Sequence, residues 1–149
     1  MALPEDLREA LVGDWIGEYK LWLQPDVVAQ ECPVTATFAP LLDERFLVHT
    51  YEWSYDGTPQ HGHAIIGRVD GTFQMAWTDT WHNGDAIMFC TGGPQPSVTG
   101  TYAESDPAGP WRWRTEFAVV DAAHVIVTAY NITPQGDEMK ATEARYAKR

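Results

Sequence analysis

The sequence has few basic residues and no long hydrophobic run, and each shortage excludes a class of partner. Ten Lys and Arg residues stand against 21 Asp and Glu residues, for a formal charge of −11. Such a charge repels nucleic acid and anionic membrane surfaces. No apolar run approaches the roughly 20 residues of a membrane-spanning helix. We therefore expect neither nucleic acid nor a membrane as a partner.

Cysteine is also scarce. Cys32 and Cys90 are the only two in 149 residues, which is more typical of free thiols than of a disulfide framework. The amino end lacks the basic region and apolar stretch of a secretory signal. The expected location is therefore a bacterial-type cytoplasm. The length fits one domain, residues 1–149, which would bury about 70% of its unfolded surface.

Helical patterning is confined to one short segment, residues 4–12. Pro4 suits a first helical position, acidic residues follow it at the positive end of the helix dipole, and Gly13 suits the end. The segment has one apolar stripe, formed by Leu3, Leu7, Ala10 and Leu11. Such a stripe could cover one end of a barrel.

The remainder is patterned as strands separated by turns. Asp56-Gly57, Asp70-Gly71 and Asn83-Gly84 are hairpin dipeptides. The predicted strands span residues 14–23, 34–41, 45–55, 61–69, 73–81, 86–91, 97–103, 111–120, 124–132 and 138–147. About ten closely spaced strands predict an all-β, antiparallel up-and-down barrel, since closure removes exposed edges. A two-sheet sandwich is the alternative fold.

Tryptophan is abundant, with seven residues. In the strand predicted over residues 73–81, Phe73, Met75, Trp77, Asp79 and Trp81 alternate onto one face. A carboxylate among indoles is costly unless it is paired or hydrogen-bonded. Asp79 is therefore either a structural anchor held by nearby donors or a group that faces a pocket.

The motif His61-Gly62-His63 places two imidazoles on one face of the preceding strand. With Arg68 directed to solvent, His63, Ile65, Gly67 and Val69 would face the interior. His63 and Asp79 could then act as an acid–base pair, and His61 would complete a possible metal site. Polar lining or a surface position is the simpler interpretation, and we expect no metal and no cofactor.

Further along, Trp111 and Trp113 are expected inside the barrel, opposite a solvated face that carries Arg112, Arg114 and Glu116. A shift of one residue in register would instead turn Arg114 inward as a partner for Asp79. The sequence leaves these two orientations open.

Several pieces, in order, resemble one family. The opening Gly13-Asp14-Trp15-Ile16-Gly17 is similar to the G-x-W signature of lipocalin and calycin-like barrels. Together with residues 51–57, 77–80, 130–138 and 145–149, it resembles domain of unknown function 1579, a bacterial calycin-like family. The resemblance implies a barrel but no activity. Nitrobindin-type haem barrels are distant relatives that bind iron through a histidine near the carboxyl end, and no histidine follows His124.

The sequence therefore favours a binding protein over an enzyme, with a small apolar or aromatic molecule inside the barrel. The expected ligand-binding residues are Trp53, Tyr55, His63, Met75, Trp77, Asp79, Trp81 and Trp113. One alternative is a small barrel isomerase, hydratase or cyclase that uses Asp79 and His63. Others are a haem or metal protein and a homodimer formed through an outer sheet face.

Overall fold

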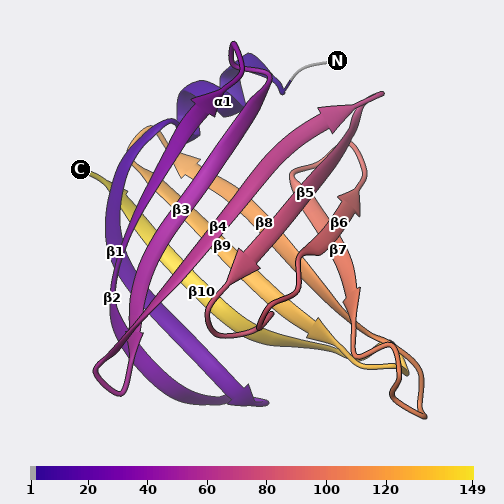
Figure 1. Cartoon of the computed structure of the whole chain (residues 1–149). Helices are drawn as coiled ribbons and strands as arrows, with labels where there is room; N and C mark the ends of the chain where they lie inside the picture. The colour runs from indigo at the N-terminus through magenta and orange to yellow at the C-terminus, as the bar shows by residue number, and fades with distance from the viewer. Residues whose placement is uncertain (1–2) are drawn as a thin grey trace.

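A computed structural model describes residues 3–149 and shows a closed antiparallel barrel with one short helix (Figure 1). Its elements are α1 (Glu5–Leu11), β1 (Gly13–Gln24), β2 (Val27–Leu41), β3 (Phe46–Tyr55), β4 (Thr58–Val69), β5 (Thr72–Asp79), β6 (Met88–Gly92), β7 (Ser97–Tyr102), β8 (Trp111–Asp121), β9 (His124–Ile132) and β10 (Glu138–Lys148). Each strand pairs with the next one along the chain, and β1 pairs with β10 to close the ring. The predicted up-and-down barrel is confirmed, and the two-sheet sandwich is wrong.

Two of the three predicted hairpin dipeptides form tight turns. In Asp56-Gly57 and Asp70-Gly71 both residues have positive φ, the backbone twist that two-residue hairpins favour. Asn83-Gly84 does not join two strands directly. It lies in a longer loop, residues 80–87, because β5 ends at Asp79 and β6 begins at Met88.

The helix α1 covers one end of the barrel (Figure 1). Leu3 and Leu11 are buried there, and Leu7 packs against the core beside them. Trp15 of the G-x-W motif has no exposed surface, and its Nε1 donates a hydrogen bond to the Leu11 carbonyl at 2.8 Å. The predicted apolar stripe is thus confirmed as the contact surface. Within residues 3–149, no helix is long and apolar enough to cross a membrane.

Both cysteines are buried free thiols, as expected. Burial raises the pKa of the Cys90 thiol to about 12. A thiol that stays protonated is a poor nucleophile, so Cys90 acts as a core residue.

In β4 the predicted orientation is wrong. Gly62, Ala64 and Ile66 are buried, whereas His63 and Ile65 are exposed. Val69 is exposed as well, and Gly67 is covered by Phe46 on the outer surface. Arg68, expected in solvent, is half-buried with its guanidinium 5.6 Å from the centre of the Phe73 ring. Because β4 has aliphatic residues on both faces, alternation alone does not decide which face is inside.

The inward glycine of the His61-Gly62-His63 motif explains the observed register. Gly62 pairs with Tyr51 of β3, and the Tyr51 ring lies against its Cα. A Cβ built at Gly62 would be 1.9 Å from Tyr51 Cζ and 2.2 Å from its hydroxyl oxygen. Only glycine leaves room for this tyrosine. Of the three residues of the motif, it is therefore Gly62 that faces the barrel interior, and both histidines face outward.

Replacing Gly62 by alanine should therefore destabilise the barrel. We expect Gly62→Ala to lower the free energy of unfolding by about 1–3 kcal/mol, the usual cost of overpacking a core. Urea denaturation followed by circular dichroism measures this. The control is Gly93→Ala, because a Cβ at Gly93 meets no atom within 4 Å. Equal stabilities for the two variants would contradict the steric explanation.

Candidate functional site

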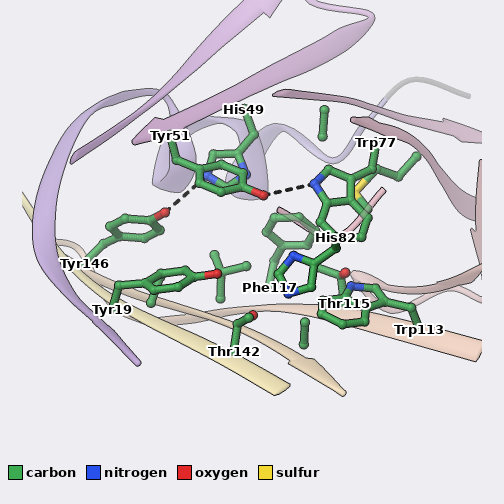
Figure 2. Close-up of a pocket in the computed structure, with 15 residues that line it drawn as sticks. Tyr19, His49, Tyr51, Trp77, His82, Trp113, Thr115, Phe117, Thr142 and Tyr146 are labelled. Atoms are coloured by element: carbon green, nitrogen blue, oxygen red, sulfur yellow. Dashed lines mark hydrogen bonds between the residues drawn. The ribbon is translucent and has the colours of Figure 1, made fainter. Parts of the chain in front are cut away.

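The barrel interior contains a small cavity, with about 40 Å³ open to the centres of water molecules (Figure 2). Aromatic rings form most of its wall. Its lining residues are Tyr19, His49, Tyr51, Ala64, Met75, Trp77, His82, Trp113, Thr115, Phe117, Val127, Ala129, Thr142, Ala144 and Tyr146. A mostly apolar wall with a few polar groups is typical of sites for small molecules. The volume suffices for a few waters, so a larger ligand would require side chains to move.

The deep part of the cavity is uncharged. His49 stacks on Phe38, with ring centres 4.1 Å apart, and burial lowers its pKa to about 3. Burial also raises the pKa of Tyr19, Tyr51 and Tyr146 well above the usual value. The imidazole is therefore neutral and the phenols stay protonated at neutral pH. Such an interior favours a neutral ligand over an ion.

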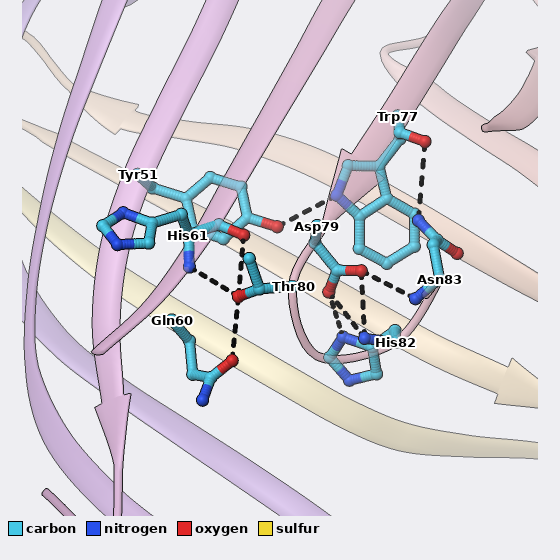
Figure 3. A network of polar contacts seen from close by, with 8 residues as sticks. All are labelled: Tyr51, Gln60, His61, Trp77, Asp79, Thr80, His82 and Asn83. Atoms are coloured by element: carbon cyan, nitrogen blue, oxygen red, sulfur yellow. Dashed lines mark hydrogen bonds and ion pairs between the residues drawn. The ribbon is translucent and has the colours of Figure 1, made fainter. Parts of the chain in front are cut away.

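At the edge of the cavity, Asp79 fixes the start of the loop after β5 (Figure 3). Its carboxylate oxygens accept hydrogen bonds from the backbone amides of His82 at 2.9 Å and Asn83 at 2.8 Å. Oδ2 also lies 2.7 Å from Nδ1 of His82. The Asp79 side chain is 2% exposed. These donors compensate the burial of the carboxylate, which confirms the structural interpretation of Asp79 as an anchor.

The turn directs the His82 ring into the cavity (Figure 2). The ring lies 4.6 Å from the Trp113 ring and 5.8 Å from the Trp77 ring, between centres. The contact of Nδ1 with the Asp79 carboxylate favours the tautomer that carries its proton on Nδ1, and in that tautomer Nε2 is an acceptor. No residue from 3 to 149 forms a hydrogen bond with this Nε2.

Trp113 supplies the complementary group. Its indole is 3% exposed, and Nε1 is buried without a hydrogen-bond partner in residues 3–149. The neighbouring Trp77 differs, since its Nε1 donates to the Tyr51 hydroxyl at 3.0 Å. A buried, unpaired N–H costs about 1–3 kcal/mol. A ligand atom that accepts from Trp113 would recover part of that cost.

Three of the eight predicted ligand-binding residues line the cavity, namely Met75, Trp77 and Trp113. Asp79 does not line it and reaches it only through His82. Trp53, Tyr55 and Trp81 form an aromatic cluster at the barrel end opposite α1. This cluster adjoins the cavity, because Trp53 stacks on Tyr19 with ring centres 4.4 Å apart.

His63 does not join the site, and its predicted place inside the barrel is wrong. It is exposed on the outer face of β4, as is His61, whereas Asp79 is buried inside. The proposed acid–base pair and the metal site of His61, His63 and Asp79 are therefore separated by the barrel wall. Within residues 3–149, no group of three or more His, Cys, Asp or Glu could hold a metal ion.

The structure also decides the orientation of Arg114. The side chain is on the outer face, with its guanidinium 2.6 Å from Glu138 and 2.7 Å from Glu116. It is therefore no partner for Asp79. Trp111 on the same strand is only half-buried, since it lies near the strand end and donates from Nε1 to Asp106 at 3.1 Å.

Sequence reasoning missed eight polar or aromatic residues of the cavity, which are Tyr19, His49, Tyr51, His82, Thr115, Phe117, Thr142 and Tyr146. For His49 and Tyr51 a signal existed, because both share one face of β3 with the apolar residues Leu47 and Trp53. For His82 the signal was the acid three residues before it and the turn dipeptide after it. The strand prediction to residue 81 hid that turn and placed His82 on the outer face.

The neutral buried His49 should make stability depend on pH. Its pKa is about 3 in the folded chain against 6.5 for the free group, so the unfolded chain binds more protons between these values. Stability is therefore fully present above pH 6.5 and falls as the pH falls toward 3, by up to about 1.4 kcal/mol per pH unit. We expect a shallower loss in His49→Phe, measured by urea denaturation from neutral pH downward. The exposed-site control His61→Gln should keep the wild-type slope, and an unchanged slope in His49→Phe would contradict the assignment.

The Asp79 anchor can be tested through its neutral analogue. Asp79→Asn keeps the shape of the side chain but replaces one carboxylate oxygen by an NH₂ group. This new donor would face a backbone amide or imidazole N–H, which is itself a donor. We expect a loss of about 1–3 kcal/mol of stability and faster amide exchange at His82 and Asn83. Asp85→Asn is the matched control, since Asp85 is exposed in the same loop. An Asp79→Asn protein as stable as this control would show that the anchor is dispensable.

Comparison with known proteins gives one result that spans nearly the whole chain. Among curated proteins there is no match. One family model covers residues 6–148, from α1 to the end of β10, in agreement with the resemblance of the sequence motifs. The chain therefore belongs to the family described as protein of unknown function (DUF1579).

Proposed function

We propose that the protein binds a small, neutral, largely apolar or aromatic molecule in the barrel interior. The observation that carries this proposal is the unpaired Nε1–H of Trp113, buried in the wall of an aromatic cavity. The His82 ring packs beside the Trp113 ring, and its Nε2 can accept a hydrogen bond. A cavity with one free donor and one free acceptor fits a molecule with a hydroxyl group on an apolar body.

The space constrains the ligand. About 40 Å³ is far less than the roughly 300–1,000 Å³ of sites for drug-sized molecules. A porphyrin would not fit without rebuilding the core, so the cavity does not suit haem. A single aromatic ring would fit if the loop of residues 80–87 moved, because this loop carries His82. Asp79 holds that loop by hydrogen bonds at only one end, which makes it the natural place of entry.

The test uses two probes of similar shape, phenol and toluene. Phenol can accept from Trp113 and donate to His82, whereas toluene can do neither. We expect phenol to bind more tightly and to shift the indole N–H resonance of Trp113 in ¹⁵N-correlated NMR spectra. In Trp113→Phe, phenol affinity should fall about tenfold, the value of one good hydrogen bond, with toluene affinity nearly unchanged.

Two results would contradict the proposal. One is that neither probe perturbs any cavity resonance at millimolar concentration. The other is that both probes bind equally before and after the Trp113→Phe change, because the indole N–H would then have no role. The variant Trp22→Phe is the control, since Trp22 is half-buried in β1 and does not line the cavity.

A second candidate function is proton transfer. The observation that favours it is the 2.7 Å contact between Asp79 and Nδ1 of His82, an arrangement that orients an imidazole as a general base. Here His82 replaces His63 in the isomerase, hydratase or cyclase alternative. Determination of the His82 tautomer by ¹⁵N NMR tests it. A neutral ring protonated on Nε2 instead of Nδ1 would remove His82 as a base.

The calycin-like relationship, the bacterial origin and the cytoplasmic location stay predictions of the sequence. None of them is needed for the binding proposal, which depends on the cavity groups alone.

A further inference from the structure

Part of the outer face of β3 to β6 is apolar, namely the half that includes the start of β3 and the end of β4. Phe46 and Val48 are outward on β3, Ile65 on β4, Ala76 on β5 and Phe89 on β6. Phe89 is 73% exposed and Ile65 is 37% exposed. Figure 1 shows these four strands side by side on one wall of the barrel. Contiguous apolar side chains on a soluble domain mark a contact surface.

This apolar part of the face carries no charged residue, although the chain has a formal charge of −11. Glu52 lies further along the outer face of β3, beside His61 of β4. The outward positions of β5 from Thr72 to Thr78 are all uncharged. On β8, by contrast, the outward positions hold Arg112, Arg114 and Glu116. Charged residues thus lie outside the apolar part of this face. Depletion of charge at the centre of a contact surface is the main compositional sign of an interface.

A groove crosses this face beside the most exposed ring. It has a volume of about 190 Å³ and lies between Phe46 and Phe89, over Gly67 and Ala76. Gly67 and Ala76 have small or no side chains, so the groove between the two rings stays open. A Cβ at Gly67 would lie 2.9 Å from Cδ1 of Phe46, so glycine lets the Phe46 ring settle against β4. The face therefore presents a protruding ring next to a hollow of suitable size for one.

We propose that this face, defined by Phe46, Val48, Ile65, Gly67, Ala76 and Phe89, is the interface of a two-fold homodimer. A two-fold interface places the same patch on both subunits, and a ring beside a hollow is self-complementary in that geometry. The Phe89 ring of each copy fills the groove of the other. Two chains of charge −11 repel each other, and contact through an uncharged wall keeps their carboxylates apart.

Analytical ultracentrifugation of the full chain over a wide concentration range tests the dimer. We expect wild type to dimerise reversibly and Phe89→Asp to weaken dimerisation by about tenfold or more, as for a central interface residue. Leu23→Asp is the matched control, because Leu23 is 60% exposed on β1, outside this face. Added sodium chloride should strengthen the wild-type dimer, since it screens repulsion without affecting apolar contact.

Far-UV circular dichroism confirms that each variant is folded. Should Phe89→Asp fail to fold, Ala76→Arg provides the same test by filling the groove from its floor. A wild-type protein that is monomeric at every concentration overturns the proposal, and so does a dimer that Leu23→Asp weakens as much as Phe89→Asp. A monomer that instead sediments with phosphatidylcholine vesicles also overturns it. These outcomes do not depend on ligand binding inside the barrel.

Discussion

The hydrogen bonds of the Asp79 carboxylate determine the architecture of the candidate site. They end β5 at residue 79, close the turn to Asn83 and direct the His82 ring into the cavity inside the barrel. A continued strand would have placed His82 on the outer surface, with the cavity missing one side. The carboxylate is tolerated inside because two backbone amides donate hydrogen bonds to it and the His82 imidazole lies within hydrogen-bond distance. One buried acid thus links strand length, loop conformation and the polar character of the cavity.

The interior otherwise follows from filling a ten-strand barrel with large rings. Such a barrel is wider than side chains of ordinary size can fill, and Tyr19, Trp53, Trp77 and Trp113 occupy most of the space. Rigid rings pack with gaps between them, and the remaining cavity lies where several meet. Two hydrogen bonds join polar atoms of the interior rings, Trp77 to Tyr51 and Tyr146 to His49. Nε1 of Trp113 is buried without a hydrogen-bond partner in residues 3–149, and the proposed ligand chemistry depends on this group.

The fold was predictable because hairpin dipeptides and strand spacing are local signals. The inward face of β5 was predictable too, since Phe73, Met75 and Trp77 alternate with polar residues. The orientation of β4 was not, because Ile65 and Ile66 suit opposite faces equally and only the pairing with β3 distinguishes them. The place of His82 depended on where β5 ends. That end is set by the hydrogen bonds of one side chain, Asp79. Such hydrogen bonds produce no periodic pattern of residues from which the end of a strand could be predicted.

The close approach of Tyr51 to Gly62 has an evolutionary consequence. With the Gly62 Cα against the phenol ring, neither position can change freely while the other stays as it is. A lineage that acquires a side chain at 62 must first reduce residue 51, and a lineage with a small residue at 51 no longer needs glycine at 62. Among relatives, these two sites should vary jointly. The flanking imidazoles at 61 and 63, which face outward, should drift independently of both.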